Sequence, residues 1–205
     1  MDYTVKHVTA EQELDKVLDF DRRIFGLSDE RDSPYSREEW LGRMENHSNL
    51  MLYAEADGEV IGLVLGRVDG KNITVGSVAV DEKFRKYGIA RELMLLLEER
   101  AVSYGINQLG LGAVESAENF YEKLGYIGTL LIQSEEHSIE ELLALNTKYP
   151  VKGTSLYNGA ISQVYLELPA PDRELQRKYE TALPGCYTQM MFWKNIKSEE
   201  ELDYE

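Results

Sequence analysis

The sequence predicts an α/β fold, in which strands and helices alternate along the chain. Three local patterns support this assignment. The dipeptide Asp57-Gly58 separates two apolar runs and is typical of a tight β-hairpin. Ser36, followed three residues later by Glu39, matches a capping box that opens a helix. After Gly88, apolar residues recur at gaps of four and three, which predicts a helix with one buried face.

The residues before 81 contain four expected strands and two expected helices. Leu14, Val17 and Leu18 fall on one face of a helix that ends before Gly26. Gly76 lies inside a strand pattern, which predicts a bulge or the close approach of another backbone. The expected strands cover residues 3–8, 50–56, 60–68 and 73–80, and the expected helices cover residues 10–25 and the segment after Ser36, with a break at residues 33–35.

The segment from Gly88 to Gln133 reads as helix, strand, short helix and strand. Gly105 ends the first helix and Gly125 ends the second, at residues 115–124, in which Phe120 is expected in the core. The strands are expected over residues 107–112 and 126–133. The buried face of the first helix is expected to consist of Ala90, Met94, Leu97, Ala101 and Tyr104.

The last third of the chain continues the same alternation. Helices are expected over residues 139–146 and 172–179, and strands over residues 159–168 and 186–193. No internal repeat or low-complexity linker separates this part from the rest. We therefore expect a single domain over residues 1–197, followed by an acidic tail over residues 198–205.

Composition is that of a soluble globular protein, with 43% hydrophobic and 29% charged residues. No run of about 18 apolar residues is present, so we expect no membrane span. The first residues lack a basic region followed by an apolar core, so we expect no signal peptide. The single cysteine, Cys186, excludes an intramolecular disulfide and fits a reducing compartment. We expect a cytoplasmic protein.

The net charge is −15, from 37 acidic and 22 basic residues. Nucleic-acid binding depends on a positive surface, so this charge argues against a nucleic-acid partner. A negative field would attract cationic substrates such as amines or polyamines. The alternative is that the charge serves solubility alone.

Residues 78–90, V-A-V-D-E-K-F-R-K-Y-G-I-A, combine the end of an apolar strand, a charged turn and the start of an amphipathic helix. The first turn of a helix has backbone N–H groups without internal partners and carries partial positive charge. Gly88 has no Cβ and allows close approach to the backbone, while Arg85 and Lys86 add full charges. This arrangement predicts a phosphate or pyrophosphate site. The alternative is a tight turn with solvated charges.

A second motif, N-F-Y-E-K-L-G-Y at residues 119–126, follows after one helix and one strand. Together, R-K-Y-G-I-A and F-Y-E-K-L-G-Y resemble the GNAT superfamily of acyl-CoA-dependent N-acetyltransferases, whose coenzyme-binding segment reads Q/R-x-x-G-x-G/A. The resemblance covers residues 3–133. It implies a GNAT-type fold, a mixed and mostly antiparallel sheet with helices on both faces, here with an enlarged C-terminal portion at residues 134–197. It also implies acetyl-CoA as cosubstrate and no metal.

The resemblance implies which residues bind the coenzyme. The bulged strand would bond the amide-rich pantetheine arm as if it were an added strand, through Val78, Ala79 and Val80. The backbone N–H of Val78 would also polarise the thioester carbonyl, as in an oxyanion hole. The pyrophosphate would be held by Arg85, Lys86, Tyr87, Gly88, Ile89 and Ala90.

Tyr121 matches the tyrosine that in this family often protonates the departing thiolate. A phenol has a pKa of about 10 and keeps its proton at neutral pH. The alternative is a packed aromatic residue. The family also often has an asparagine on the loop before this helix, but residues 112–117 contain none, and Asn119 is too close to Tyr121 to take that role.

The sequence leaves the general base open. Some family members carry a glutamate on the strand before the coenzyme motif, where this chain has Ile73, Thr74 and Val75. Glu55 and Glu115 are possible bases, and the alternative for each is a solvated or capping carboxylate. An acceptor that arrives as a neutral amine would need no strong base.

Other chemistries lack the residues they need. The histidines, His7, His47 and His137, have no spacing typical of zinc sites. Cys186 has no visible histidine partner and is expected to be a structural thiol. Residues 190–193, M-M-F-W, are expected in the core or in a protein interface.

The sequence therefore predicts an N-acetyltransferase that moves an acetyl group from acetyl-CoA to a primary amine by direct transfer. We expect a small-molecule acceptor, because Tyr35, Trp40 and the C-terminal elaboration suggest a covered site. One alternative is a protein or peptide N-acetyltransferase. Another is an acetyl-CoA-binding module that has lost the transfer activity. A homodimer built through the C-terminal strand is compatible with all three.

Overall fold

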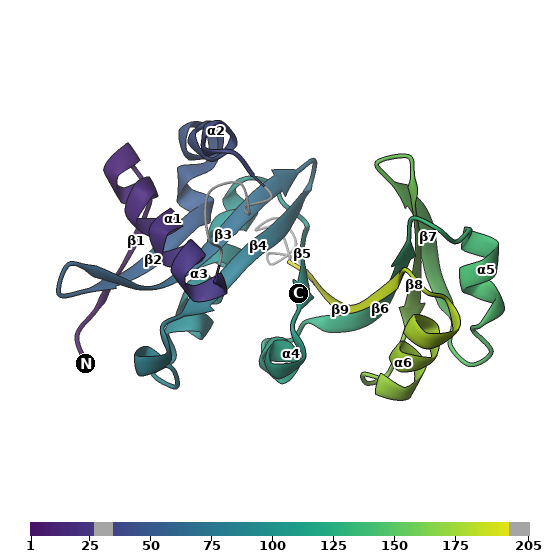
Figure 1. The fold of residues 1–205 in the computed structure, drawn as a ribbon. Coiled ribbons are helices and arrows are strands. Elements are labelled where there is room, and N and C mark those ends of the chain that lie inside the picture. The colour runs from purple at the N-terminus through teal and green to yellow at the C-terminus, as the bar shows by residue number, and fades with distance from the viewer. Residues whose placement is uncertain (27–34, 197–205) are drawn as a thin grey trace, which may run out of the picture. The chain divides into compact units, whose positions relative to one another are not determined.

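The computed structural model describes residues 1–26 and 35–196 and divides into two compact units (Figure 1). The first unit contains Met1–Leu109 and the chain from Asn195, and the second contains Gly110–Lys194. Most of the predicted break at residues 33–35 and the predicted acidic tail lie outside the described residues. The assignment of residues 1–197 to a single domain stays a prediction.

The first unit is built on four antiparallel strands that follow one another across the sheet in chain order. Asp57 and Gly58 both have positive φ angles, 53° and 83°, as the tightest hairpin turns require. The hairpin predicted at this dipeptide is therefore confirmed. The strands are β1 (Thr4–His7), β2 (Met51–Ala56), β3 (Glu59–Asp69) and β4 (Asn72–Val80).

Helices cover both faces of these strands. The first face packs against α1 (Glu11–Phe25), whose Leu14 and Val17 share a core with Leu63 and Leu65 of β3. The second face packs against α3 (Ile89–Ser103). There, the Cβ that glycine lacks at positions 62 and 66 of β3 would lie 3.0 Å from Ile89 and 3.3 Å from Leu97. Because neighbouring strand residues point to opposite faces, α1 and α3 lie on opposite sides of β3.

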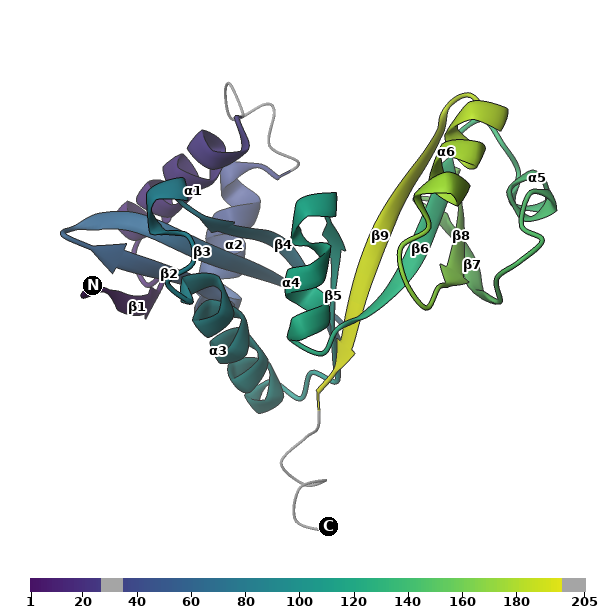
Figure 2. The ribbon, with the colours of Figure 1, turned by 90° about the horizontal axis from the view of Figure 1, so that it is seen from below.

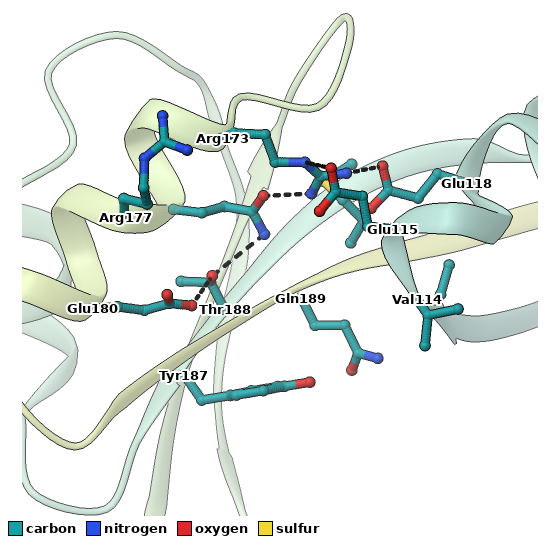
Figure 3. Close-up of a pocket in the computed structure, with 12 residues that line it drawn as sticks. Val114, Glu115, Glu118, Arg173, Arg177, Glu180, Tyr187, Thr188 and Gln189 are labelled. Carbon is teal, nitrogen blue, oxygen red and sulfur yellow. Dashed lines mark hydrogen bonds and ion pairs between the residues drawn. The ribbon is translucent and has the colours of Figure 1, made fainter. Parts of the chain in front are cut away.

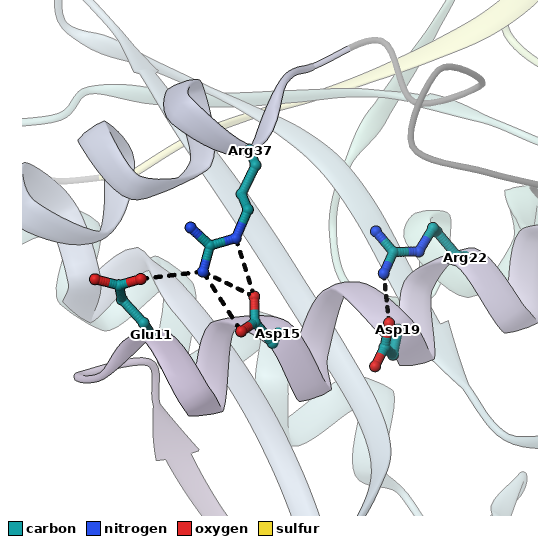
Figure 4. Close-up of polar contacts among 5 residues, drawn as sticks. All are labelled: Glu11, Asp15, Asp19, Arg22 and Arg37. Carbon is teal, nitrogen blue, oxygen red and sulfur yellow. Dashed lines mark hydrogen bonds and ion pairs between the residues drawn. The ribbon is translucent and has the colours of Figure 1, made fainter.

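The helix α2 (Arg37–His47) begins at the predicted capping box, in which Ser36 Oγ accepts a bond from the Glu39 N–H. Figure 4 shows how its first residue reaches α1. Arg37 Nη2 lies 3.1 Å from Glu11 Oε2 and 3.1 Å from Asp15 Oδ1. These contacts are exposed, and exposed ion pairs contribute little to stability, so they orient α2 more than they stabilise it.

The predicted buried face of α3 is correct in its centre and wrong at its end. Met94, Leu97 and Ala101 are fully buried, whereas Ala90 is half-buried and Tyr104 is 39% exposed. The helix ends at Ser103, so Tyr104 no longer follows the helical repeat. Ile89 and Leu93 complete the buried face instead.

The second unit has a sheet in the order β5-β9-β6-β8-β7. Figure 2 shows β9 running beside β6, and the two strands are antiparallel, with Met190 opposite Leu130. Because β9 has β5 on one side and β6 on the other, it has no free edge for the strand-to-strand dimer considered from the sequence. The strands are β5 (Gln108–Ala113), β6 (Ile127–Ser134), β7 (Val151–Tyr157), β8 (Ile161–Glu167) and β9 (Cys186–Asn195).

Three short helices complete the second unit. The helix predicted over residues 115–124 is divided into a 3₁₀ turn at Glu115–Ala117 and α4 (Glu118–Lys123). The other two, α5 (Ile139–Ala144) and α6 (Arg173–Ala182), are joined by a 2.8 Å hydrogen bond from the Tyr179 hydroxyl to the Leu142 carbonyl. In residues 1–26 and 35–196, no helix is long and apolar enough to cross a membrane.

Candidate active site

A bulge interrupts the pairing of β4 with β3. Leu65 is paired with Ser77, and the next residue of β3, Gly66, is paired with Val75, so Gly76 has no partner on β3. The bulge predicted at Gly76 is therefore confirmed. A bulge bends its strand and leaves the extra residue outside the ladder of hydrogen bonds.

After the bulge, pairing resumes between Ser77 and Leu65 and continues between Val78 and Val64 and between Val80 and Gly62. Ala79 is buried in the core beneath α1, whereas Val78 and Val80 are half-buried. Side chains alternate along a strand, so Ser77 and Ala79 point toward α1 and the two valines toward α3. The role of residues 78–80 in binding pantetheine stays a prediction.

The segment between β4 and α3 forms an exposed turn with two left-handed residues. Lys86 has a φ angle of 69° and Gly88 one of 87°. Arg85, Lys86 and Tyr87 are exposed, while Ile89 is buried and anchors the start of the helix. The turn thus presents two cationic side chains to solvent on a backbone fixed at both ends.

The start of α3 has backbone donors that no side chain caps. Gly88 occupies the N-cap position and has no side chain to accept a hydrogen bond. The helical hydrogen bonds begin with the Glu92 N–H, which donates to the Gly88 carbonyl at 3.0 Å. The N–H groups of Ile89, Ala90 and Arg91 precede that bond. Helix N-termini with such groups bind anions.

Contacts at the base of this turn fix its geometry. The Asp81 carboxylate accepts the Lys83 N–H at 3.1 Å and is paired with Arg23 of α1 at 2.9 Å. The bond from Arg23 has the largest effect, and together with the Lys83 N–H it holds the pKa of Asp81 below its usual value. Arg85 donates from Nε to the Val80 carbonyl at 3.4 Å. Its guanidinium is thereby placed beside the end of β4.

Tyr121 lies in the second unit, on α4, and is 6% exposed. Its ring is 5.1 Å from that of Phe120, 6.0 Å from that of Tyr126 and 5.8 Å from that of Phe192. Burial raises the pKa of Tyr121 to about 12, so the phenol stays protonated at neutral pH. Its role as an acid stays a prediction. Phe120, expected in the core, is half-buried.

The two carboxylates considered as bases are both engaged in ion pairs. Glu55 lies 2.5 Å from Lys6 Nζ. Glu115 lies 3.4 Å from Arg173 Nε, and its side chain is 77% exposed. Both carboxylates therefore have the kind of partner that the structural alternative implies.

A cavity of about 400 Å³ opens in the second unit. Figure 3 shows Arg173 of α6 directed toward Glu115 and Glu118, with Glu118 buried beneath it. A second chain of bonds links Gln176 to Thr188 at 3.3 Å and Thr188 to Glu180 at 2.6 Å. This cavity could not be predicted from the sequence, because its residues come from separate segments that only the fold brings together. It is lined by Ala113, Val114, Glu115, Glu118, Arg173, Gln176, Arg177, Glu180, Tyr187, Thr188, Gln189 and Met190.

The remaining reactive side chains have ordinary surroundings. Among the described residues, no group of three or more His, Cys, Asp or Glu residues is placed to hold a metal ion. Cys186 is a buried free thiol, and burial raises its pKa to about 11, which makes it a poor nucleophile. His137 lies 2.9 Å from the Pro184 carbonyl.

Residues 14–126 match the sequence model of a protein family described as Acetyltransferase (GNAT) family. The chain belongs to this family. The match covers more than half of the 205 residues and contains both the R-K-Y-G-I-A and the F-Y-E-K-L-G-Y motifs. The chain therefore belongs to the GNAT acetyltransferases by family and has the fold predicted from the sequence, a mixed α/β sheet that does not close on itself.

Solved structures show the same GNAT fold at low identity. Ard1 from Thermoplasma volcanium is 14% identical, with a TM-score of 0.54, over 97% of this chain and 100% of that one. The ribosomal-protein-S18-alanine N-acetyltransferase from Escherichia coli is 15% identical, with a TM-score of 0.51, over 83% and 98%. N-acetylglutamate synthase from Neisseria gonorrhoeae is 13% identical, with a TM-score of 0.51, over 96% of this chain and 36% of that one.

Proposed function

We propose that this GNAT protein transfers an acetyl group from acetyl-CoA to the primary amine of a small molecule, directly and without a metal. One observation carries the proposal. β4 has a bulge at Gly76, and the helix that follows it in the chain, α3, begins at Gly88 without a side-chain cap. An extended amide-rich arm and an anionic diphosphate need these two features side by side.

The coenzyme supplies the thioester, and the chain supplies its binding. The uncapped N–H groups of Ile89 and Ala90 are donors for phosphate oxygens, and the exposed Arg85 and Lys86 add charge. The φ of 87° at Gly88 lets the backbone turn into the helix without a Cβ in the way. In this proposal the backbone of Val78 and Val80 bonds the pantetheine arm.

Two groups are proposed to act on the reacting atoms. The Val78 N–H polarises the thioester carbonyl as a fixed donor. The Tyr121 phenol gives its proton to the departing thiolate, and its pKa of about 12 keeps that proton available at neutral pH. The negative charge of the chain supports a cationic acceptor, because such a field raises the local concentration of amines.

A protein or peptide acceptor is the second possibility. The E. coli structure is named for a ribosomal-protein substrate, and the N. gonorrhoeae structure is named for acetylglutamate, so the shared fold supports either acceptor class. We favour the smaller acceptor because Tyr35 and Trp40 are expected to cover the site. Their rings lie 5.6 Å apart, and Arg43 stacks on both, at 3.8 and 4.3 Å, so this proposed cover is a packed aromatic group. A cytoplasmic location and a homodimer likewise stay proposals.

Two measurements test the proposed function in order. Calorimetric titration with acetyl-CoA, with free acetate as the control, is expected to show micromolar binding to the coenzyme alone. Thiol release is then measured with polyamines, amino acids and peptides as acceptors. Binding without thiol release on the whole panel would instead support the module that has lost transfer, and faster release with peptides would favour a protein acceptor.

A further inference from the structure

An aspartate continues the buried stripe of α1. Leu14, Val17 and Leu18 of this stripe are 0%, 0% and 7% exposed. Asp21 follows Val17 by four residues and Leu18 by three, so it lies on the same helix face. By contrast, Asp19 is 71% exposed and paired with Arg22, as Figure 4 shows.

The Asp21 carboxyl is held in surroundings that disfavour its charge. Its Oδ1 atom is buried and has no hydrogen-bond partner within the described part of the chain. Burial raises the pKa of Asp21, against the smaller and opposite effects of the Ser77 hydroxyl and the Arg22 guanidinium. An ionised carboxylate in such a place is stabilised when a cation or a hydrogen-bond donor approaches it.

The Ser77 hydroxyl, which acts on this carboxyl, lies beside the bulge of β4. Ser77 is the residue at which pairing resumes after Gly76, and it points toward α1. The next residue is Val78, whose N–H is the proposed donor to the thioester carbonyl. The Asp21 carboxyl therefore lies on the α1 side of β4, beside the residue that precedes Val78 in the strand.

From this placement we infer that Asp21 receives the amino group of the acceptor and takes a proton from it during acetyl transfer. The inference rests on the proposed function and supplies the base that Glu55 and Glu115 do not. Those two carboxylates already have cationic partners, Lys6 and Arg173. By contrast, Asp21 Oδ1 is buried without a hydrogen-bond partner in the residues that the structure describes, and the ammonium group of the acceptor would supply one.

The proton balance of the step is simple. The acceptor ammonium gives one proton to the Asp21 carboxylate, which frees the nitrogen lone pair. The nitrogen forms the C–N bond at the thioester carbonyl carbon, and the C–S bond breaks. The departing sulfur takes the Tyr121 proton and leaves as the thiol, and the second nitrogen proton, lost as the amide forms, passes through solvent to restore the phenol. Asp21 returns its proton to solvent.

The test compares Asp21→Asn with Asp19→Asn, since each removes one negative charge from α1 at nearly constant size. The acceptors are the best amine of the screen and hydroxylamine, which is already neutral at neutral pH. For the ordinary amine, Asp21→Asn is expected to lose about 10²–10⁴-fold in kcat/KM. Acetyl-CoA affinity stays the same, the loss shrinks strongly with hydroxylamine, Asp21→Glu recovers part of the rate, and Asp19→Asn behaves as wild type.

Each other outcome is decisive. An Asp21→Asn variant that keeps its rate, or that loses the same factor with both acceptors while folded, overturns the inference and leaves the proposed function intact. A wild type that binds acetyl-CoA and transfers to no amine overturns the proposed function, and the inference with it. Thermal melting of each variant checks folding, and Asp21→Asn is expected to melt no lower than wild type because it removes a poorly paired charge.

Discussion

Ile89, the first residue of α3, packs against Gly62 of β3 so closely that a Cβ atom added at Gly62 would lie 3.0 Å from Ile89 Cγ2. The same added atom would lie 3.2 Å from the Ala79 carbonyl oxygen and 3.2 Å from Val80 Cγ2. A single missing methyl group thus sets the distance between β3 and the start of the helix that is proposed to hold the coenzyme.

Gly62→Ala is therefore expected to lower both stability and coenzyme affinity. Overpacking of this kind costs about 1–3 kcal/mol, and relief requires Ile89 and the first turn of α3 to move. Thermal melting and titration with acetyl-CoA measure the two effects. The control is Gly42→Ala in α2, where an added Cβ meets nothing within 4 Å and helix propensity improves. A Gly62→Ala protein with wild-type melting and affinity would show that the contact is not tight.

Gly88→Asp is expected to weaken acetyl-CoA binding by at least about tenfold. The substitution forces a residue with a Cβ to a φ angle of 87° and adds a negative charge where the diphosphate is proposed to bind. Gly70→Asp is the matched control, because Gly70 also has a positive φ, 60°, and open space around it, but lies in the β3–β4 hairpin. If both variants bind acetyl-CoA like the wild type, the turn before α3 does not bind the diphosphate.

Tyr121→Phe is expected to lower the rate of thiol release by about 10²–10⁴-fold without changing acetyl-CoA affinity. The ring contacts with Phe120, Tyr126 and Phe192 remain, so melting should change little. Because the pKa of Tyr121 is about 12, the wild-type rate should show no loss from phenol ionisation near neutral pH. Tyr165→Phe, which removes a 3.0 Å bond to Gln163, is the control. A Tyr121→Phe enzyme with full activity would assign this ring to packing alone.

Much of the fold could be predicted because its signals are local. The turn at Asp57-Gly58 and the capping box at Ser36 depend on neighbouring residues, and both are present in the structure. β7 was missed for a physical reason. It is an edge strand with nearly every residue exposed, so it has no alternation of apolar and polar residues to detect.

The site was predictable only where one segment carries it. The turn before α3 and the bulge at Gly76 each lie within a few residues, and the sequence pointed to both. Asp21 was missed, although an acidic residue in the stripe of Leu14, Val17 and Leu18 was a visible signal. Its meaning depends on Ser77, which only the folding of α1 onto β4 brings beside it.

Asp172, the N-cap of α6, is expected to stabilise the protein at neutral pH and to lose that effect in acid. Its carboxylate accepts the Leu175 N–H, the Tyr149 hydroxyl and Lys148, which lower its pKa to about 2 from an ordinary value of 3.8. A depressed pKa in the folded state means that the stabilisation is complete above the ordinary pKa and disappears as the pH falls through about 2. Asp172→Ala should therefore melt below the wild type at neutral pH and approach it as the pH falls toward that value, while Glu174→Ala, in the same helical turn, should change melting less. A difference between Asp172→Ala and wild type that is the same at every pH would contradict this account.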